Sequence, residues 1–360
     1  MSDDLAYWVA LTRFRAFGSV RLGKLSRRFP SMRTAFEASA SQLIEAGIEP
    51  EIVNRFLQER IHINPEQEFE RLAEHHVRAI TIKDVDYPPL LKEIFDPPAV
   101  LFVRGTLPPS TLKHLGVVGS RKATPYGKRA VERIVEPLAQ SGVVIVSGLA
   151  YGIDACAHQA TLDVNGITIA VLGSGVDQES IYPSQNRTLS SAMLAKGGAL
   201  LSEFPIGTPP LKQHFPFRNR VIAGLSHGVL VIEGALKSGS LITATAAMEA
   251  GREVYAIPGP IDAPLSEGPN NLIKQGATMV TEPTDIFGIT LRARPQGVIY
   301  EPQNPEEELL LKSLSHEPKH IDEIVRLSNL PIHVASSTMT MLEIKGVAHH
   351  EGGRYYTKAS

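Results

Sequence analysis

Short apolar runs alternate with helical stretches through the middle of the chain, from Leu115 to Val280. The runs are rich in β-branched residues, and the stretches between them are long enough for helices. Continuous apolar runs of this kind predict strands buried on both faces of a sheet and joined by crossover helices. We therefore predict an α/β fold, a doubly wound parallel sheet. The predicted strands are Gly116–Val118, Val143–Val146, Ile167–Leu172, Ala199–Leu201, Val229–Ile232, Val254–Ile257 and Met279–Val280.

Two other patterns precede this region. Residues 1–64 place apolar side chains at helical spacing and predict a small all-helical domain. Pairs of prolines interrupt residues 65–112, where we expect two short strands, Ala79–Ile82 and Val100–Arg104. We assign residues 65–293 to the domain that contains the sheet.

The C-terminal part of the chain returns to helix-forming sequence. Residues 294–304 are rich in Pro and Gln and predict a linker. In residues 305–360, three helical segments are followed by two short segments of strand character, Val347–His349 and Tyr355–Tyr356. Three helices that end in a two-stranded hairpin are typical of a winged helix.

The charge of this predicted winged helix does not favour duplex DNA. Residues 300–360 contain six Lys and Arg against nine Asp and Glu, and the segment expected to face a DNA groove, Val334–Lys345, has one cation at its far end. A helix that reads bases needs Arg, Lys, Asn or Gln, and a negative module repels phosphates. We expect the module to bind a protein or another part of its own chain, with duplex DNA as the weaker alternative.

Composition narrows the possible functions. The chain has 360 residues, 43% of them hydrophobic, which is ordinary for a soluble globular protein. Its single cysteine, Cys156, excludes an internal disulfide and a zinc site built on several thiolates, and it favours a reducing compartment. No uncharged apolar run reaches the roughly 18 residues that a membrane span needs, and the first apolar run follows two Asp, unlike a signal peptide. We predict a cytoplasmic protein with no membrane partner.

Small, hydroxylated and basic residues gather where the predicted strands end. The carboxyl ends of parallel strands share one edge of a sheet, so we expect these residues to converge. Glycines admit backbone N–H groups to a phosphate, helix N-termini add partial positive charge, and Arg or Lys completes the site. Ser238 and Ser240 have an alternative role as caps of the helix that begins near Leu241. The candidate phosphate-binding residues are Gly119, Ser120, Arg121, Ser147, Gly148, Lys237, Ser238, Gly239 and Ser240.

Further polar side chains extend this set. The additional candidates are Asn186, Arg187, Arg218, Asn219 and Arg220. The first two lie at a predicted helix start, and the other three lie in Phe217–Ser226, the helix expected before the fifth strand. The formal net charge is −2, so binding of nucleic acid has to rest on a local patch such as this one. A strip of cations over a glycine-rich edge suits a phosphate chain, whereas each cation alone is more often a solvated surface charge.

Signatures of enzymes are weak in this sequence. The dinucleotide fingerprint needs three spaced glycines after the first strand, and the mononucleotide loop needs a lysine where Ser240 stands. No nucleophile elbow or zinc-protease motif occurs, and the histidines lack the spacing of metal ligands. A nucleophile with helpers, Ser147, Asp154 and His158, is less favoured than Asp154 as a helix cap and His158 on a helix face. We expect no cofactor, no metal and no catalytic residue.

Six blocks of the central domain form an ordered set. They are GVVGSRKATPYG (Gly116–Gly127), SGLAYGIDACAH (Ser147–His158), FRNRVIAGLS (Phe217–Ser226), KSGSLITA (Lys237–Ala244), Gly259 after the sixth strand, and GPNNLIKQGA (Gly268–Ala277). The set resembles the DNA-processing protein A (DprA/Smf) family, and one position departs from it, Ser174, where many members have cysteine. The resemblance implies an extended Rossmann-like sheet, flanked by a helical domain like a SAM or helix-hairpin-helix domain and by a winged helix.

The resemblance also implies a function. A member of this family would bind single-stranded DNA, protect incoming DNA and help to load a RecA-type recombinase during natural transformation, without catalysis. By matching motif, Arg121 and Lys237 would contact phosphates, and Asn186, Asn219 and Arg220 would lie beside them. Family members suggest a homodimer through the sheet domain, for which the apolar segment Leu272–Val280 is a candidate surface.

Two other functions remain open. One is a Rossmann-like enzyme that binds or hydrolyses nucleotides, although Pro258-Gly259-Pro260-Ile261 lacks the turn expected of such a relative. The other is a scaffold whose terminal modules dock partners. The first 36 residues contain seven basic side chains against two acidic ones, so we also expect the helical domain to assist DNA binding without being essential for it.

Overall fold

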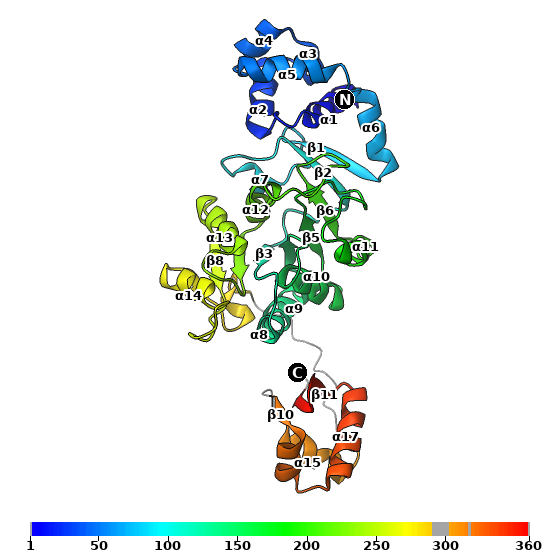
Figure 1. The fold of residues 1–360 in the computed structure, drawn as a ribbon, viewed down its shortest axis with the longest axis vertical. Coiled ribbons are helices and arrows are strands. Elements are labelled where there is room, and N and C mark those ends of the chain that lie inside the picture. Colours follow the sequence, from blue (N-terminus) through cyan, green and yellow to red (C-terminus); the bar gives the residue numbers. More distant parts are fainter. Residues whose placement is uncertain (1, 290–301, 316–317, 359–360) are drawn as a thin grey trace. The chain divides into compact units, whose positions relative to one another are not determined.

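One nine-stranded sheet organises the first of the two units into which the chain divides, Met1–Arg292 and Ala293–Ser360 (Figure 1). The computed structural model describes residues 2–289, 302–315 and 318–358. The strands are β1 (Val77–Thr81), β2 (Val100–Gly105), β3 (His114–Val118), β4 (Val144–Ser147), β5 (Thr168–Val171), β6 (Ala199–Ser202), β7 (Gly228–Val231), β8 (Glu253–Ala256) and β9 (Thr278–Met279). Their order in the sheet is β1-β2-β6-β5-β4-β3-β7-β8-β9.

The predicted fold class is confirmed. In the part of the sheet with the order β6-β5-β4-β3-β7-β8-β9, all neighbouring strands pair in parallel. Strand β2 pairs antiparallel with both β1 and β6. Every predicted strand of this sheet begins and ends within two residues of an observed one. The largest shift in the parallel part is at β3, which begins at His114 and not at Gly116. Strand β9 stops at Met279, although the Val280 N–H still donates to the Ala256 carbonyl at 2.9 Å.

Helices cover both faces of the sheet, since successive residues of a strand point to opposite faces. Val117 packs with α9 and α10 on one face, and its neighbour Val118 packs with α12 and α13 on the other. The helical segments of this region are α7 (Pro89–Lys92), α8 (Pro125–Ala130), the π-helical stretch η1 (Val131–Val135), α9 (Glu136–Gln140), α10 (Ile153–Asp163), η2 (Ser184–Asn186), α11 (Arg187–Ala195), α12 (His214–Leu225), α13 (Gly239–Glu249), α14 (Glu267–Lys274) and η3 (Pro283–Asp285).

Two helices begin earlier than the sequence predicts. Helix α12 starts at His214 and not at Phe217, because Pro216 lies in its first turn, where a missing N–H costs no helical hydrogen bond. Helix α13 starts at Gly239 and not near Leu241. Both helices therefore bring their first turns closer to the strand ends than expected.

The N-terminal helices share their core with the sheet. Trp8, Leu11 and Phe14 belong to the same buried cluster as Phe102 of β2 and Leu200 of β6. In Figure 1 these helices lie over the β1–β2 end of the sheet. A domain boundary at residues 64 and 65 stays a prediction, and the packing is continuous across it. The helices are α1 (Ser2–Arg13), α2 (Ser19–Arg28), α3 (Met32–Glu37), α4 (Ala40–Glu45), α5 (Pro50–Arg60) and α6 (Pro65–Glu74).

The second unit has the three helices and the hairpin of a winged helix, as predicted. Its own core includes Leu310, Ile324 and Met339, one from each helix. A short strand that the sequence did not indicate, β10, pairs with β12, and the sheet order is β10-β12-β11. Most of the predicted linker, 294–304, lies outside the described residues. The elements are α15 (Pro305–Ser313), β10 (Lys319–His320), α16 (Ile321–Ser328), α17 (Ile332–Ile344), β11 (Ala348–Gly352) and β12 (Tyr355–Lys358).

Candidate nucleic-acid interface

The candidate site lies at the carboxyl ends of β3 and β7, which are neighbours in the sheet. The chain turns in one direction after β3 and returns on the other side of it as β7, so this pair marks the switch point of the topology. The loops after the two strands are tied together, because the Thr124 N–H donates to the Glu233 carboxylate at 3.0 Å and the Thr124 hydroxyl donates to the same group. The candidate residues on the two loops are thus held side by side.

Arg121 is exposed on the loop after β3. Its guanidinium carbon lies 5.4 Å from the centroid of the Phe215 ring on α12, in cation–π geometry. The loop below it is fixed to α10, since the Ile153 N–H donates to the Ser120 carbonyl at 3.0 Å. Gly119 is needed there because a Cβ would lie 2.7 Å from Ile153. The structure therefore presents Arg121 to solvent on a rigid base.

The turn Lys237-Ser238-Gly239-Ser240 leads from β7 into α13, and Lys237 is exposed on it. Ser238 occupies the N-cap position, as the capping alternative expects, but its side chain makes no capping hydrogen bond. Instead the hydroxyls of Ser238 and Ser240 are 2.6 Å apart and hydrogen-bonded to each other. The side chain of Ser238 therefore leaves the first backbone N–H groups of α13 without a cap of their own.

Arg218 is buried beneath the strand ends. Its Nη1 donates to the Gly148 carbonyl at 2.6 Å and to the Val171 carbonyl, which follow β4 and end β5. Burial lowers the pKa of Arg218 to about 10, so it stays charged at neutral pH, and Asp154 acts in the opposite direction. Burial raises the pKa of Asp154, against the pull of the Arg218 charge and of hydrogen bonds from the backbone of Ala150 and Gly148. Arg218 is a fixed cation below the surface.

Three further candidate side chains donate hydrogen bonds to backbone carbonyls. The Ser147 hydroxyl is fully buried and donates to the Val117 carbonyl at 2.6 Å. The Asn186 amide donates to the Leu149 carbonyl at 2.8 Å, and the Asn219 amide donates to the Gly239 carbonyl at 3.2 Å. These residues hold the loops of the site in place.

Two candidate arginines are engaged by oxygens of other segments, including those that follow β5 and β6. Arg220 forms an ion pair with Glu203, and its Nη1 donates to the Asp96 carbonyl at 2.6 Å. Arg187 donates to the Glu179 carbonyl. Among the described residues, Arg121 and Lys237 are the cations of the predicted strip that form neither an ion pair nor a side-chain hydrogen bond, so they are its free cations.

The nucleophile arrangement considered for Ser147, Asp154 and His158 does not form. His158 is fully buried, and its Nδ1 lies 2.7 Å from the Thr168 hydroxyl and not against Ser147. Burial lowers the pKa of His158 to about 3. Thr168 in turn donates to the Ile145 carbonyl at 2.8 Å, which fixes His158 as a structural residue between α10 and the sheet.

Two kinds of feature are missing from the part of the chain that the structure describes. No group of three or more His, Cys, Asp and Glu side chains there could hold a metal ion. No helix among those residues is long and apolar enough to cross a membrane.

Phe215 is the contact that sequence reasoning missed. Its ring lies under Arg121 and 6.0 Å from the Arg218 guanidinium carbon. A helix that begins at His214 places Phe215 and Arg218 three residues apart on one face. The predicted helix began at Phe217, so Phe215 lay outside it and its position beside Arg218 could not be inferred.

Comparison with known proteins identifies the family. The family model described as DNA recombination-mediator protein A matches residues 78–290, and the DprA winged helix domain matches residues 295–354. The chain belongs to the DNA recombination-mediator protein A (DprA) family. Membership of this family confirms the predicted role in DNA processing. The second match confirms the predicted winged helix.

Curated relatives in the DprA family support this assignment along the whole chain. Protein Smf from Escherichia coli (strain K12) is 46% identical over 278 residues, which is 74% of this chain and 74% of that protein. Protein Smf from Synechocystis sp. is 36% identical and covers 99% of both chains. The similarity therefore includes the N-terminal helices.

Two solved structures resemble this protein. The X-ray structure of DNA processing protein A from Streptococcus pneumoniae has a TM-score of 0.67 and 34% identity, and it covers 80% of this chain and 99% of its own. A structure of DNA processing protein A from Helicobacter pylori, titled for its single-stranded DNA binding mode, has a TM-score of 0.51 and 29% identity, and it covers 59% of this chain and 94% of its own.

Proposed function

We propose that this protein binds single-stranded DNA across the carboxyl ends of β3 and β7, as a recombination mediator without catalytic activity. The observation that carries the proposal is the pair of exposed cations, Arg121 and Lys237, on loops that are joined at the switch point of the sheet. Neither has an ion-pair partner among the described residues. Unpaired cations on a fixed base attract phosphates with little reorganisation.

The residues of this surface divide into contacts and supports. We name Arg121, Phe215 and Lys237 the strand-end surface. The two cations contact phosphates, and the Phe215 ring orients Arg121 from below. Arg218, with its charge held against two strand-end carbonyls, adds positive potential from beneath the surface.

Smaller groups complete the phosphate path. Gly148 lies over Arg218, and backbone N–H groups at Gly119 and Ser120 and at Gly239 and Ser240 offer donors to phosphate oxygens. Ser147, Asn186 and Asn219 act indirectly, by holding backbone carbonyls of these loops. Arg187 and Arg220 lie at the margin of the path, since carbonyl or carboxylate oxygens already occupy them.

Salt-dependent binding tests the contacts. Fluorescence anisotropy with a labelled oligothymidylate would be measured for the parent, Arg121→Ala, Lys237→Ala and the double variant. Each variant loses one phosphate contact, so the slope of log K against log salt falls by about 0.7 per substitution. Lys113→Ala is the matched control, because Lys113 is an exposed cation just before β3, at the opposite edge of the sheet. Equal slopes for the double variant and the Lys113 variant would exclude this surface.

The non-enzymatic character and the recombination role need separate assays. Nucleotide hydrolysis by the same preparation would be followed at the concentrations used for binding. Turnover that the Arg121 and Lys237 substitutions abolish would favour the nucleotide enzyme. The mediator role, in natural transformation, predicts that the protein shortens the lag before a RecA-type recombinase assembles on single-stranded DNA.

We also propose that the protein acts as a homodimer through the sheet domain. The predicted surface, Leu272–Val280, is partly used within the chain, because Leu272 and Val280 are buried in its own core. Met279 is 52% exposed on β9, the edge strand of the sheet, and remains available to a partner. Light scattering at tens of micromolar that returns the 39.1 kDa mass of one chain would refute the dimer.

A further inference from the structure

A cleft of about 460 Å³ lies between the N-terminal helices and the sheet, beside the start of α12. One wall is the connection between α1 and α2, with Arg15, and the first residue of α2, Ser19. The other walls are the segment between β6 and α12 and the first turn of α12, with His214 and Phe217. The volume falls within the roughly 300 to 1,000 Å³ of small-ligand sites.

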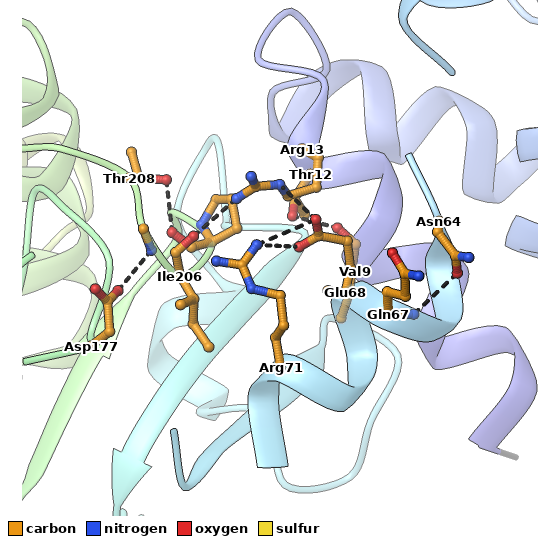
Figure 2. Close-up of polar contacts among 12 residues, drawn as sticks. Val9, Thr12, Arg13, Asn64, Gln67, Glu68, Arg71, Asp177, Ile206 and Thr208 are labelled. Atoms are coloured by element: carbon orange, nitrogen blue, oxygen red, sulfur yellow. Dashed lines mark hydrogen bonds and ion pairs between the residues drawn. The ribbon is translucent and has the colours of Figure 1, made fainter. Parts of the chain in front are cut away.

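The two sides of the cleft are fixed to each other (Figure 2). Nη1 of Arg13 on α1 donates to the Ile206 carbonyl at 2.9 Å, and the same guanidinium pairs with Glu68 at 3.3 Å. The segment that contains Ile206 is braced in turn, because the Gly207 N–H donates to Asp177 at 2.8 Å. The cleft is therefore preformed, which lowers the entropic cost of filling it.

Aromatic rings line one side of the cleft. The Phe204 and His214 rings are stacked, with centroids 4.1 Å apart and planes at 18°. Phe217 is 58% exposed, although it is a large apolar side chain on a helix that is otherwise mostly buried. Exposed aromatic rings beside a cation are the usual platforms for unstacked bases.

One cation of the cleft is free. Of the seven basic residues in the first 36, all but Arg15 and Arg27 form an ion pair or a side-chain hydrogen bond within the described residues. Arg15 lines the cleft, and Arg27 does not. The other charged groups of the lining are engaged in ion pairs, since Arg220 pairs with both Glu203 and Asp96, and Arg13 pairs with Glu68. Arg15 is thus the cation of the lining that has no carboxylate within ion-pair distance among the described residues.

Helix α12 joins this cleft to the strand-end surface. His214 and Phe217 are three residues apart and both line the cleft. Phe215 and Arg218 have the same spacing and lie together on the side of the strand ends. The two places therefore lie on neighbouring faces of the first turn of α12, with the exposed Phe217 ring at the cleft and the half-buried Phe215 ring at the strand ends.

We propose that the cleft binds a nucleotide of the same single strand that crosses the strand-end surface, with its phosphate on Arg15 and its base against Phe217. This site rests on the proposed function, because it extends the path of that strand. It also explains why the N-terminal helices would assist binding: Arg15 contributes, and the paired cations around it do not.

A length series tests the position of this site. Oligothymidylates of about 4 to 16 nucleotides cover the range of known single-strand sites. In the parent, affinity rises with a step once the strand reaches the cleft. Arg15→Ala removes that step and lowers the salt slope by about 0.7 for the long oligomers, leaving the short ones unchanged. Arg27→Ala, an exposed arginine of the same region, is the matched control and keeps the step.

Stacking is tested with a fluorescent side chain. In Phe217→Trp, a base that stacks on residue 217 quenches tryptophan emission, while native Trp8 is 3% exposed and gives a constant background. Long oligomers quench the emission and short ones do not. Ile61→Trp, at another exposed position outside the cleft, shows no length dependence. Phe217→Ala weakens binding of long oligomers by roughly tenfold, the loss expected for one stacked base.

The outcomes separate the two proposals. If Arg15→Ala matches Arg27→Ala at every length, the cleft site is refuted while the strand-end surface stands. If free thymidine monophosphate quenches Phe217→Trp as strongly as the long oligomers do, the cleft binds free nucleotides and the continuous path is refuted. Loss of the step in Arg15→Ala with no effect of Arg121→Ala or Lys237→Ala supports the cleft and refutes the strand-end surface. A parent that binds no oligomer refutes both.

Discussion

Substituting Gly148 by alanine should destabilise the sheet unit, because the new methyl group meets a buried charge. A Cβ at this position would lie 2.1 Å from Nη1 of Arg218 and 2.4 Å from its Cζ. The guanidinium cannot withdraw freely, since Nη1 is bonded to the carbonyls of Gly148 and Val171. A hydrogen bond from a charged donor contributes about 1.5 to 3 kcal/mol, and overpacking costs about 1 to 3 kcal/mol. We expect a loss of about 2 to 4 kcal/mol in the free energy of unfolding.

Thermal melting followed by tryptophan fluorescence suits this test, because the single tryptophan, Trp8, is buried in a cluster that also contains Leu149. At about 2 °C per kcal/mol for a large domain, the melting temperature of Gly148→Ala should fall by about 4 to 8 °C. The control is Gly239→Ala, where a Cβ meets nothing within 4 Å, so its melting temperature should stay within about 2 °C of the parent.

A double-substitution cycle identifies the cause of the loss. In an Arg218→Met background the methyl group at 148 no longer meets a guanidinium, so the Gly148→Ala cost should shrink. The reasoning fails if Gly148→Ala melts within about 1 °C of the parent, or if its cost is unchanged in that background.

Three further outcomes are expected. The unfolded chain protonates His158 near pH 6.5 while burial holds the folded pKa at about 3, so stability falls as pH drops below 6.5. His158→Gln should lose less stability than the parent between pH 7 and 5 in urea unfolding, and His62→Gln, at an exposed position, should match the parent. Thr124→Ala should lower the free energy of unfolding by about 1 to 2 kcal/mol, because the α8 cap and the hydroxyl that donates to Glu233 are lost, and Thr124→Ser should restore most of it. A fragment of residues 300–360 should leave double-stranded DNA unshifted at pH 7.5 and physiological salt; a shift would contradict the argument from its net charge of −3, six Lys and Arg against nine Asp and Glu.

The sheet could be predicted from sequence because its strands are buried on both faces. Continuous runs such as Val143–Val146 contain no polar residue, so the ends of each run mark the ends of a strand. Helix-length segments separate the runs. The start of α12 was harder, since Pro216 normally argues for a helix beginning after it. Strand β10, with two residues, carries no periodic signal.

The site could be predicted in its location and only partly in its contacts. Strand ends converge by topology, so Arg121 and Lys237 were accessible to sequence reasoning. Whether an arginine is free or engaged depends on packing between distant segments. Arg218 bonds to Gly148, which is 70 residues away, and Arg220 meets Glu203 and Asp96 on another loop. No local pattern distinguishes these three arginines.

The role of the N-terminal helices changes with the structure. Deleting residues 1–64 is not a clean test of their contribution to DNA binding. Because Trp8 and Phe14 share one buried cluster with Phe102 and Leu200, that deletion would uncover one face of the sheet and expose its core. Single substitutions at Arg15 and Arg27 test the contribution of these helices to DNA binding without exposing the core.

The shared core also constrains how the chain folds during its synthesis. Trp8 and Leu11 cannot complete their packing until Leu200 has left the ribosome. At about 5 to 20 residues per second, this delay is roughly 10 to 40 s, during which an aromatic-rich helical segment has no sheet to cover it. The nascent chain is therefore exposed to aggregation over most of its translation, and slowing synthesis before β6 should raise its dependence on chaperones.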